Sequence, residues 1–320
     1  MHAPKHSKVG QPVQGQGLTE PARRPRLSAM TALWDKLEFG RTDLPVSRLA
    51  IGSSYGVGGS DLERAYERGI NFFFWGMRRT GRFAEGVRSV AAKDRESMCI
   101  AIQTYSRSAL LVRPWVEKAL RGLKTDYVDI LTLSWWSDMP PERIIDAALE
   151  LRDEGKARHL MISCHHRPSF ARMIDDDRFE AIMARYNAAH TGAEREVFPL
   201  LDTAERRPGV LAFTATRWGS LLDPSFVPEG ERTPTATDCY RFVLSNPDVD
   251  VSLCGPKNGE ELDGAFAALD KGPLDAEEMA WMRRVGATVH ERRPGRGPVN
   301  TLDKVANFFA RRRPAAEAPE

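Results

Sequence analysis

The chain has 320 residues, of which 42% are hydrophobic and 28% charged, and its formal net charge is +2. This length suits one large barrel or two ordinary domains. The balanced charge excludes the strongly basic surface typical of proteins that bind nucleic acid. No run of about 18 apolar residues occurs, so we expect neither a membrane-spanning helix nor a membrane partner.

Four cysteines are spread along the chain without a Cys-x-x-Cys pair: Cys99, Cys164, Cys239 and Cys254. Their spacing predicts neither a disulfide framework nor a zinc site, and it fits a reducing compartment. The first residues also lack the apolar segment of a secretory signal. We therefore expect a cytoplasmic protein.

Both ends of the chain have a composition typical of disorder. Residues 1–33 are polar and rich in Gly, Pro, Lys and Gln, and residues 311–320 read RRRPAAEAPE. Such segments lack the apolar side chains that would offset the entropy of folding. We predict a disordered N-terminal tail (1–33) and a disordered C-terminal tail (311–320) on either side of one domain (34–310).

Short apolar runs alternate with helical patterns along the predicted domain. Eight runs have the length and composition of buried strands: 48–52, 70–74, 99–103, 128–134, 159–163, 180–186, 210–213 and 249–254. Segments with helical periodicity separate most of them, among them 61–68, 112–123, 141–154 and 259–269. Eight repeats of strand and helix predict an α/β fold, a closed (β/α)₈ TIM barrel. An open doubly wound sheet is the alternative, but no Gly-x-Gly-x-x-Gly follows the first run.

The carboxyl ends of the strands in such a barrel meet at one mouth. Aromatic and polar residues, many of them basic, follow several of the predicted strands and would gather there: Arg78, Arg79, Arg82, Tyr105, Ser134, Trp135, Trp136, Cys164, His165, His166, His190, Arg217 and Trp218. Aromatic rings and cations together suit a small ligand that is planar or anionic. The sequence therefore predicts a ligand site at this mouth.

Three segments carry a resemblance to a known family. They read GINFFFWGMRR at 69–79, CIAIQTY at 99–105 and DYVDILTLSWW at 126–136. Each resembles a block of the aldo-keto reductase family, and similar blocks continue in order through about 36–285 of this chain. The resemblance implies a (β/α)₈ barrel of the aldo-keto reductase type.

In that family these blocks carry an Asp, a Tyr, a Lys and a His, a tetrad whose members act together in proton transfer. At the matching positions this chain has Phe74, Arg79, Gln103 and Ser134. A guanidinium does not release a proton near neutral pH as a phenol can, and Gln has no charge with which to tune a pKa. Loss of such a set typically removes several powers of ten in rate. The resemblance therefore implies a protein of this family without classical carbonyl reductase activity.

The resemblance preserves part of a cofactor site. Ser163 matches a Ser that contacts the nicotinamide carboxamide, and Phe213 matches the aromatic residue that stacks against the nicotinamide. Lys257 and Asn258 match the segment that binds the 2′-phosphate of the adenosine, and a Lys suits that charge. The Asn that follows Ser163 in the family is replaced by Cys164. The resemblance thus implies a site for NADP(H) that is retained only in part.

Other side chains at the predicted mouth could supply chemistry. His165 is a candidate general base, with Tyr105 or Ser134 as its partner. Arg79 could hold an anionic group or form an ion pair with Asp138 or Glu85. The Cys and His side chains at 164–166 would point in different directions from a strand end, so we predict no metal site.

The sequence leaves three functions open. The first is a divergent NADP(H)-dependent oxidoreductase, or another enzyme, that uses His165 or Tyr105 in place of the tetrad. The second is a non-catalytic protein whose partly retained NADP(H) pocket binds a small or nucleotide ligand, or serves a protein partner. The third is a purely structural partner with its Arg-rich tails as contacts. Replacement of all four tetrad groups favours the second function.

Overall fold

A computed structural model describes residues 32–76 and 80–292 of the chain. The predicted tails, apart from residues 32 and 33, lie outside these ranges. So do Arg78, Arg79 and residues 293–310 of the predicted domain.

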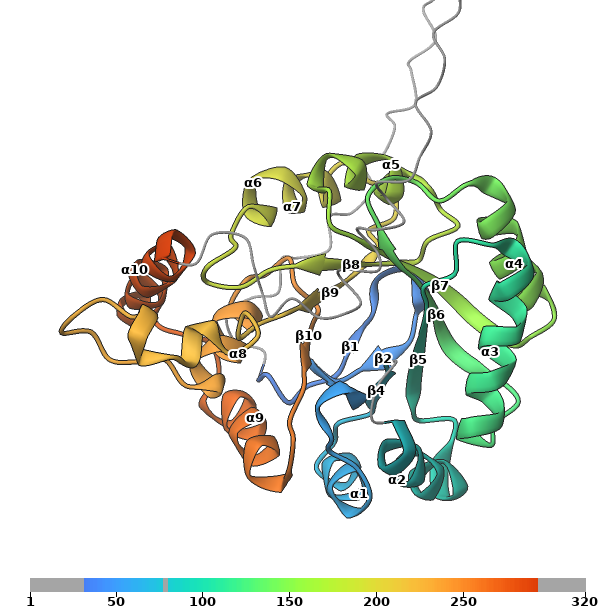
Figure 1. Cartoon of the computed structure of the whole chain (residues 1–320), viewed down its shortest axis with the longest axis horizontal. Coiled ribbons are helices and arrows are strands. Elements are labelled where there is room, and N and C mark those ends of the chain that lie inside the picture. Colours follow the sequence, from blue (N-terminus) through green and yellow to red (C-terminus); the bar gives the residue numbers. More distant parts are fainter. Residues whose placement is uncertain (1–31, 77–79, 293–320) are drawn as a thin grey trace, which may run out of the picture.

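Eight parallel strands close into a barrel in the order β10-β3-β4-β5-β6-β7-β8-β9 (Figure 1). Each strand overlaps one of the predicted apolar runs. Their bounds are β3 (Leu49–Gly52), β4 (Phe72–Trp75), β5 (Cys99–Thr104), β6 (Val128–Trp136), β7 (Ala157–Cys164), β8 (Ala181–Arg185), β9 (Gly209–Phe213) and β10 (Val251–Cys254). The closed barrel confirms the predicted (β/α)₈ fold and excludes the open sheet.

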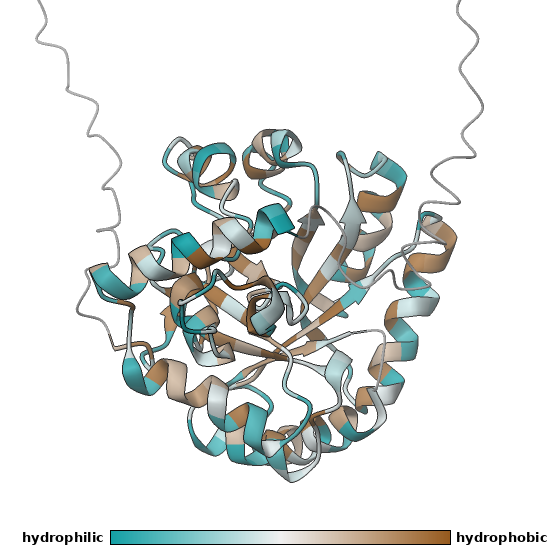
Figure 2. Ribbon diagram, turned by 60° about the vertical axis from the view of Figure 1, so that its left-hand side comes forward, coloured by the Kyte–Doolittle hydropathy of each residue, from teal (hydrophilic) through white to brown (hydrophobic). Residues whose placement is uncertain are grey.

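Helices form a ring around the barrel (Figure 1). Their bounds are α1 (Ser60–Glu67), α2 (Thr80–Asp94), α3 (Ala109–Leu123), α4 (Glu142–Asp153), α5 (Phe170–Asp175), α6 (Ala193–Glu196), α7 (Phe198–Leu201), α8 (Ala236–Leu244), α9 (Gly259–Lys271) and α10 (Ala276–Arg292). Apolar and polar residues interleave along these helices (Figure 2), so that one face packs on the strands and the other meets solvent. Within the described ranges, no helix has both the length and the apolarity that crossing a bilayer requires.

The alternation of side chains along the strands divides the apolar core into an inner and an outer part. In β4, Phe72 and Phe74 belong to the inner cluster, whereas Phe73 packs outward against Phe83 of α2 at a ring distance of 6.4 Å. This is the period of two expected of a strand. The same alternation decides which residues of each strand point into the barrel, and hence which ones reach its mouth.

An antiparallel hairpin of β1 (Leu37–Glu38) and β2 (Pro45–Val46) covers the amino end of the barrel. Phe39 follows β1 and packs into the inner cluster, with its ring 5.6 Å from that of Phe72. Gly40 has a φ of 56°, and a Cβ there would lie 1.8 Å from the backbone nitrogen of Gly209. The inside of the barrel is therefore closed at this end, and a ligand would enter from the opposite, carboxyl end.

Candidate functional site

Three of the four positions that match the tetrad lie at the carboxyl ends of β4, β5 and β6. Phe74 is 3% exposed and belongs to the apolar cluster inside the barrel. Ser134 is 1% exposed, and its Oγ donates a hydrogen bond to Oε1 of Gln103 at 3.2 Å. None of these three side chains is an acid or a base. Arg79 lies outside the described residues.

A row of four rings crosses the mouth from β5 to β9. The centroid distances are 4.9 Å from Tyr105 to Trp135, 6.5 Å from Trp135 to His165 and 5.7 Å from His165 to Phe213. Each pair meets edge to face, an arrangement that aromatic pairs prefer. The row thus lines the mouth with rings from the ends of β5, β6, β7 and β9, and the first two of these strands carry Gln103 and Ser134.

Arg107 fixes one end of this aromatic row. Its guanidinium donates to the backbone oxygens of Ser134, at 3.2 Å, and Trp135, and it lies 3.9 Å from the ring centre of Trp136. Trp135 has a φ of 61°, in the left-handed region that few residues with side chains adopt. The register between β6 and β7 also shifts near this residue. Arg107 thus holds a strained turn that aims the Trp135 ring across the mouth.

The two predicted catalytic residues share a neighbour. Tyr105 and His165 both contact the ring of Trp135, which is the link between them in the aromatic row. Burial raises the pKa of Tyr105, so its hydroxyl is a weaker acid than an exposed phenol. The structure therefore brings the two residues to one place. Their roles as general base and partner stay predictions.

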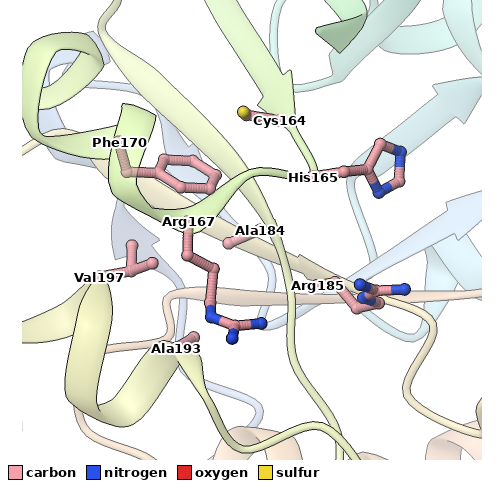
Figure 3. A pocket seen from close by; sticks show the side chains of 8 residues that line it. All are labelled: Cys164, His165, Arg167, Phe170, Ala184, Arg185, Ala193 and Val197. Atoms are coloured by element: carbon pink, nitrogen blue, oxygen red, sulfur yellow. The ribbon is translucent and has the colours of Figure 1, made fainter. Parts of the chain in front are cut away.

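Basic side chains gather where β7 and β8 end. Cys164, His165, Arg167, Phe170, Ala184, Arg185, Ala193 and Val197 line a cavity of about 10 Å³ (Figure 3). The Cys164 thiol donates to the backbone oxygen of His166 at 3.3 Å, and burial raises its pKa. The thiol is therefore protonated and is not an activated nucleophile.

The described residues contain no group of three or more His, Cys, Asp and Glu side chains placed to hold a metal ion. His166 instead makes a hydrogen bond with Ser169 at 2.9 Å between Nδ1 and Oγ. His166 therefore contacts a hydroxyl of the following 3₁₀ turn (Arg167–Ser169).

The residues predicted to hold the cofactor fall into two groups. Ser163, in β7, and Phe213, at the end of β9, lie at the mouth. Lys257 and Asn258 lie between β10 and α9, where Asn258 caps the helix by accepting from the backbone nitrogen of Glu261 at 2.9 Å. The Lys257 ammonium pairs with Glu261 at 3.1 Å. An anion at Lys257 would have to compete with that carboxylate.

A hollow of about 410 Å³ opens beside Lys257. Tyr55, Gly56, Gly81, Arg82 and Lys257 line it. Two cations and a tyrosine ring around an open hollow suit the phosphate and base of a nucleotide. Tyr55 was not among the predicted site residues, because its place depends on packing between the loops after β3 and β10.

Arg185 and Arg107 were also missing from the predicted site. Arg185 could have been found, since it lies two residues after Met183 and therefore on the same inward face of β8. No comparable pattern in the sequence indicates Arg107. Its contacts join the loop after β5 to the end of β6, and only the folded chain brings these together.

Residues 60–210 match the model of the Aldo/keto reductase family. Among solved structures, the barrel is similar to the holo form of aldo-keto reductase AKR11C1 from Bacillus halodurans, with a TM-score of 0.67 and 20% identity over 78% of this chain and 96% of that chain. It is also similar to an aldo/keto reductase from Klebsiella pneumoniae in complex with NADP and acetate, with a TM-score of 0.64 and 21% identity over 79% and 95% of the two chains. At these identities the structural likeness shows the fold.

Proposed function

We propose that this member of the aldo/keto reductase family, whose residues 60–210 match the family model and whose barrel has the same fold, binds NADP(H) without catalysing the ordinary reduction of carbonyl compounds. The nucleotide would serve as a ligand or a regulatory signal. The proposal has two parts, a retained cofactor site and a lost proton donor, and different residues support each part.

The first part is supported at both ends of the expected cofactor. Phe213 offers a ring at the mouth and Ser163 a hydroxyl inside it, while Lys257 and Arg82 border the 410 Å³ hollow. A planar ring and a buried hydroxyl suit a nicotinamide, and the two cations suit a phosphate. Structures of a similar protein contain NADP or NADPH.

The second part depends on the hydrogen bond between Ser134 and Gln103, beside the buried ring of Phe74. Carbonyl reduction requires an acid that protonates the carbonyl oxygen as the hydride arrives. A serine hydroxyl held by an amide oxygen does not release a proton near neutral pH. Arg79, at the position of the family's Tyr, does not release one either. This hydrogen bond is the observation that carries the proposal.

A second candidate function has one observation in its favour. The His165 ring meets the Phe213 ring edge to face at 5.7 Å, next to the surface on which a nicotinamide would stack. An imidazole there could move a proton in a different reaction, making the protein a non-classical oxidoreductase. Tyr105 supports this function less, because its raised pKa makes it a weak acid.

A barrel that binds a nucleotide but catalyses no reaction would act through another molecule. We therefore also propose a protein partner that distinguishes the nucleotide-bound from the nucleotide-free protein. The four cysteines are free and buried, which fits the reducing cytoplasm as its compartment.

Calorimetric and fluorescence titration with NADPH tests the first part of the proposal. We expect a dissociation constant in the micromolar range. NADPH oxidation with an aromatic aldehyde then tests the second part, with an active member of the family as the assay standard. We expect no turnover above background. Failure to bind NADPH at about millimolar concentration would refute the first part, and turnover close to that of the standard would refute the second.

A further inference from the structure

Arg185 occupies the last position of β8 and starts from the inner face of the barrel. Ala181 and Met183, four and two residues before it, belong to the inner apolar cluster. Its backbone pairs in register with that of Phe213 on β9. Because side chains alternate along a strand, Arg185 emerges at the mouth beside the ring of Phe213.

The charge of Arg185 is not balanced by an acid. Among the described residues, its guanidinium makes neither a hydrogen bond nor an ion pair, and the basic side chains near it are Arg167 and a neutral His190. Burial, and then the charge of Arg167, lower its pKa. Arg167 is already paired with Glu196 at 2.9 Å. A half-buried cation among basic groups is unfavourable unless an anion joins it.

Two buried nitrogen atoms near Arg185 also lack hydrogen-bond partners. They are Nε of Arg167 and Nδ1 of His190. A buried polar atom without a partner costs free energy, and such atoms are rare in folded proteins. The cavity lined by Arg167 and Arg185, at about 10 Å³, has room for no more than one water molecule. A larger ligand would therefore have to bind outside this cavity. Arg185 lies on the same side of the cavity as His165, away from Phe170 and Val197 (Figure 3).

We infer that Arg185 anchors the carboxylate of a small ligand whose planar, apolar part lies against the rings of His165 and Phe213. A guanidinium binds a carboxylate through two parallel hydrogen bonds. The rings of His165 and Phe213 stand nearly perpendicular, at 82°, so the planar part of the ligand would stack on one ring and meet the other edge to face. The inference rests on the proposed function, because both place a ligand at the mouth of the barrel. It adds that one ligand of this mouth is a planar carboxylate.

Calorimetry and tryptophan fluorescence with benzoate, a planar carboxylate, test the inference, and benzamide serves as its neutral counterpart. We expect benzoate to bind the full chain with a millimolar or lower dissociation constant. Arg185→Gln should weaken benzoate binding by at least about tenfold, since a hydrogen bond to a charged group is lost. Arg185→Lys should retain part of the affinity. Arg121→Gln, on the exposed face of α3, is the matched control and should bind as the wild type does.

Three outcomes would overturn the inference: no benzoate binding at about 10 mM, equal benzoate affinity in the wild type and Arg185→Gln, or equal affinity of the wild type for benzoate and benzamide. Circular dichroism of Arg185→Gln establishes that the variant is folded. NADPH titration of the wild type keeps the two proposals apart. Benzoate binding without NADPH binding would refute the nucleotide proposal alone, and the reverse result would refute the carboxylate site alone.

Discussion

Ser134 and Gln103, from neighbouring strands at the mouth of the barrel, are joined by a hydrogen bond of 3.2 Å between Oγ and Oε1. Phe74 points into the barrel from β4, the strand that pairs with β5, and is buried among apolar side chains. Three sites at which the family's tetrad would place ionisable groups are therefore occupied by a neutral pair and a ring. Reversal of single positions leaves the others unsuited to proton transfer.

We expect the double variant Arg79→Tyr, Gln103→Lys to remain without measurable aldehyde reduction. A Lys at 103 would lie beside Ser134, with Phe74 at the position of the family's carboxylate, and burial without a counter-ion lowers the pKa of an ammonium. The introduced phenol would then lack the charges that make it a useful acid. NADPH oxidation with an aromatic aldehyde measures the effect. A rate within about tenfold of an active family member would contradict this expectation.

Lys257→Ala should weaken NADPH binding about tenfold and leave NADH binding nearly unchanged. The ammonium of Lys257 borders the hollow of about 410 Å³, where it would meet the additional phosphate that only NADPH carries. Glu261→Gln should instead strengthen NADPH binding, because it releases Lys257 from its 3.1 Å ion pair.

Paired titrations with the two nucleotides report this preference directly. Lys271→Ala provides the control, since Lys271 is exposed and is the last residue of α9, whereas Lys257 lies just before the first residue of that helix. If Lys257→Ala lost equal affinity for NADPH and NADH, the 2′-phosphate would not bind at Lys257.

Much of the fold could be predicted because the barrel strands are short, apolar and buried on both faces. The run 70–74, for example, needed no partner to be recognised as a strand. Helix α2 was not among the helices named from the sequence. It contains Gly81 and Gly86, which weaken helical patterns, and a Cβ at Gly86 would lie 2.7 Å from the backbone oxygen of Gly59. Close packing, which no local pattern reports, requires that glycine.

The site could be predicted only in part, for a similar reason. Tyr105 and His165 could be placed at the mouth because each follows a strand. Their common contact with Trp135 depends on a residue with a φ of 61° and on the contacts of Arg107 with backbone oxygens. Neither feature has a pattern in the sequence. The chemistry of the mouth therefore follows from tertiary contacts that the order of residues does not reveal.

Arg41→Met should destabilise the fold by about 3 kcal/mol without changing ligand binding at the mouth. Arg41 is 6% exposed and donates hydrogen bonds to backbone oxygens at the closed end of the barrel, including Ile174 at 2.6 Å and Phe179 at 3.1 Å. Methionine fills a similar volume and leaves these oxygens without their donor. Urea unfolding measures the change, with Arg121→Met as the control. Equal stability of the two variants would show that the network is dispensable.

His190 makes the stability of the fold depend on pH in a predictable direction. Its pKa is lowered to about 3, first by burial and then by the basic side chains of Arg185, Arg217, His290 and Arg167. The pKa of a histidine in an unfolded chain is about 6.5. Between these values the unfolded chain binds a proton that the native chain does not. The contribution of His190 is therefore fully present above about pH 6.5 and is lost as the pH falls towards 3.

His190→Gln removes this titrating group while keeping a polar side chain, and should flatten the fall in stability between about pH 7 and pH 4. The difference between the two proteins over that window should be on the order of 2 kcal/mol, after allowance for partial exposure to solvent. Urea midpoints at several pH values provide the measurement. Parallel curves for wild type and variant would mean that the native His190 binds a proton as readily as the unfolded one.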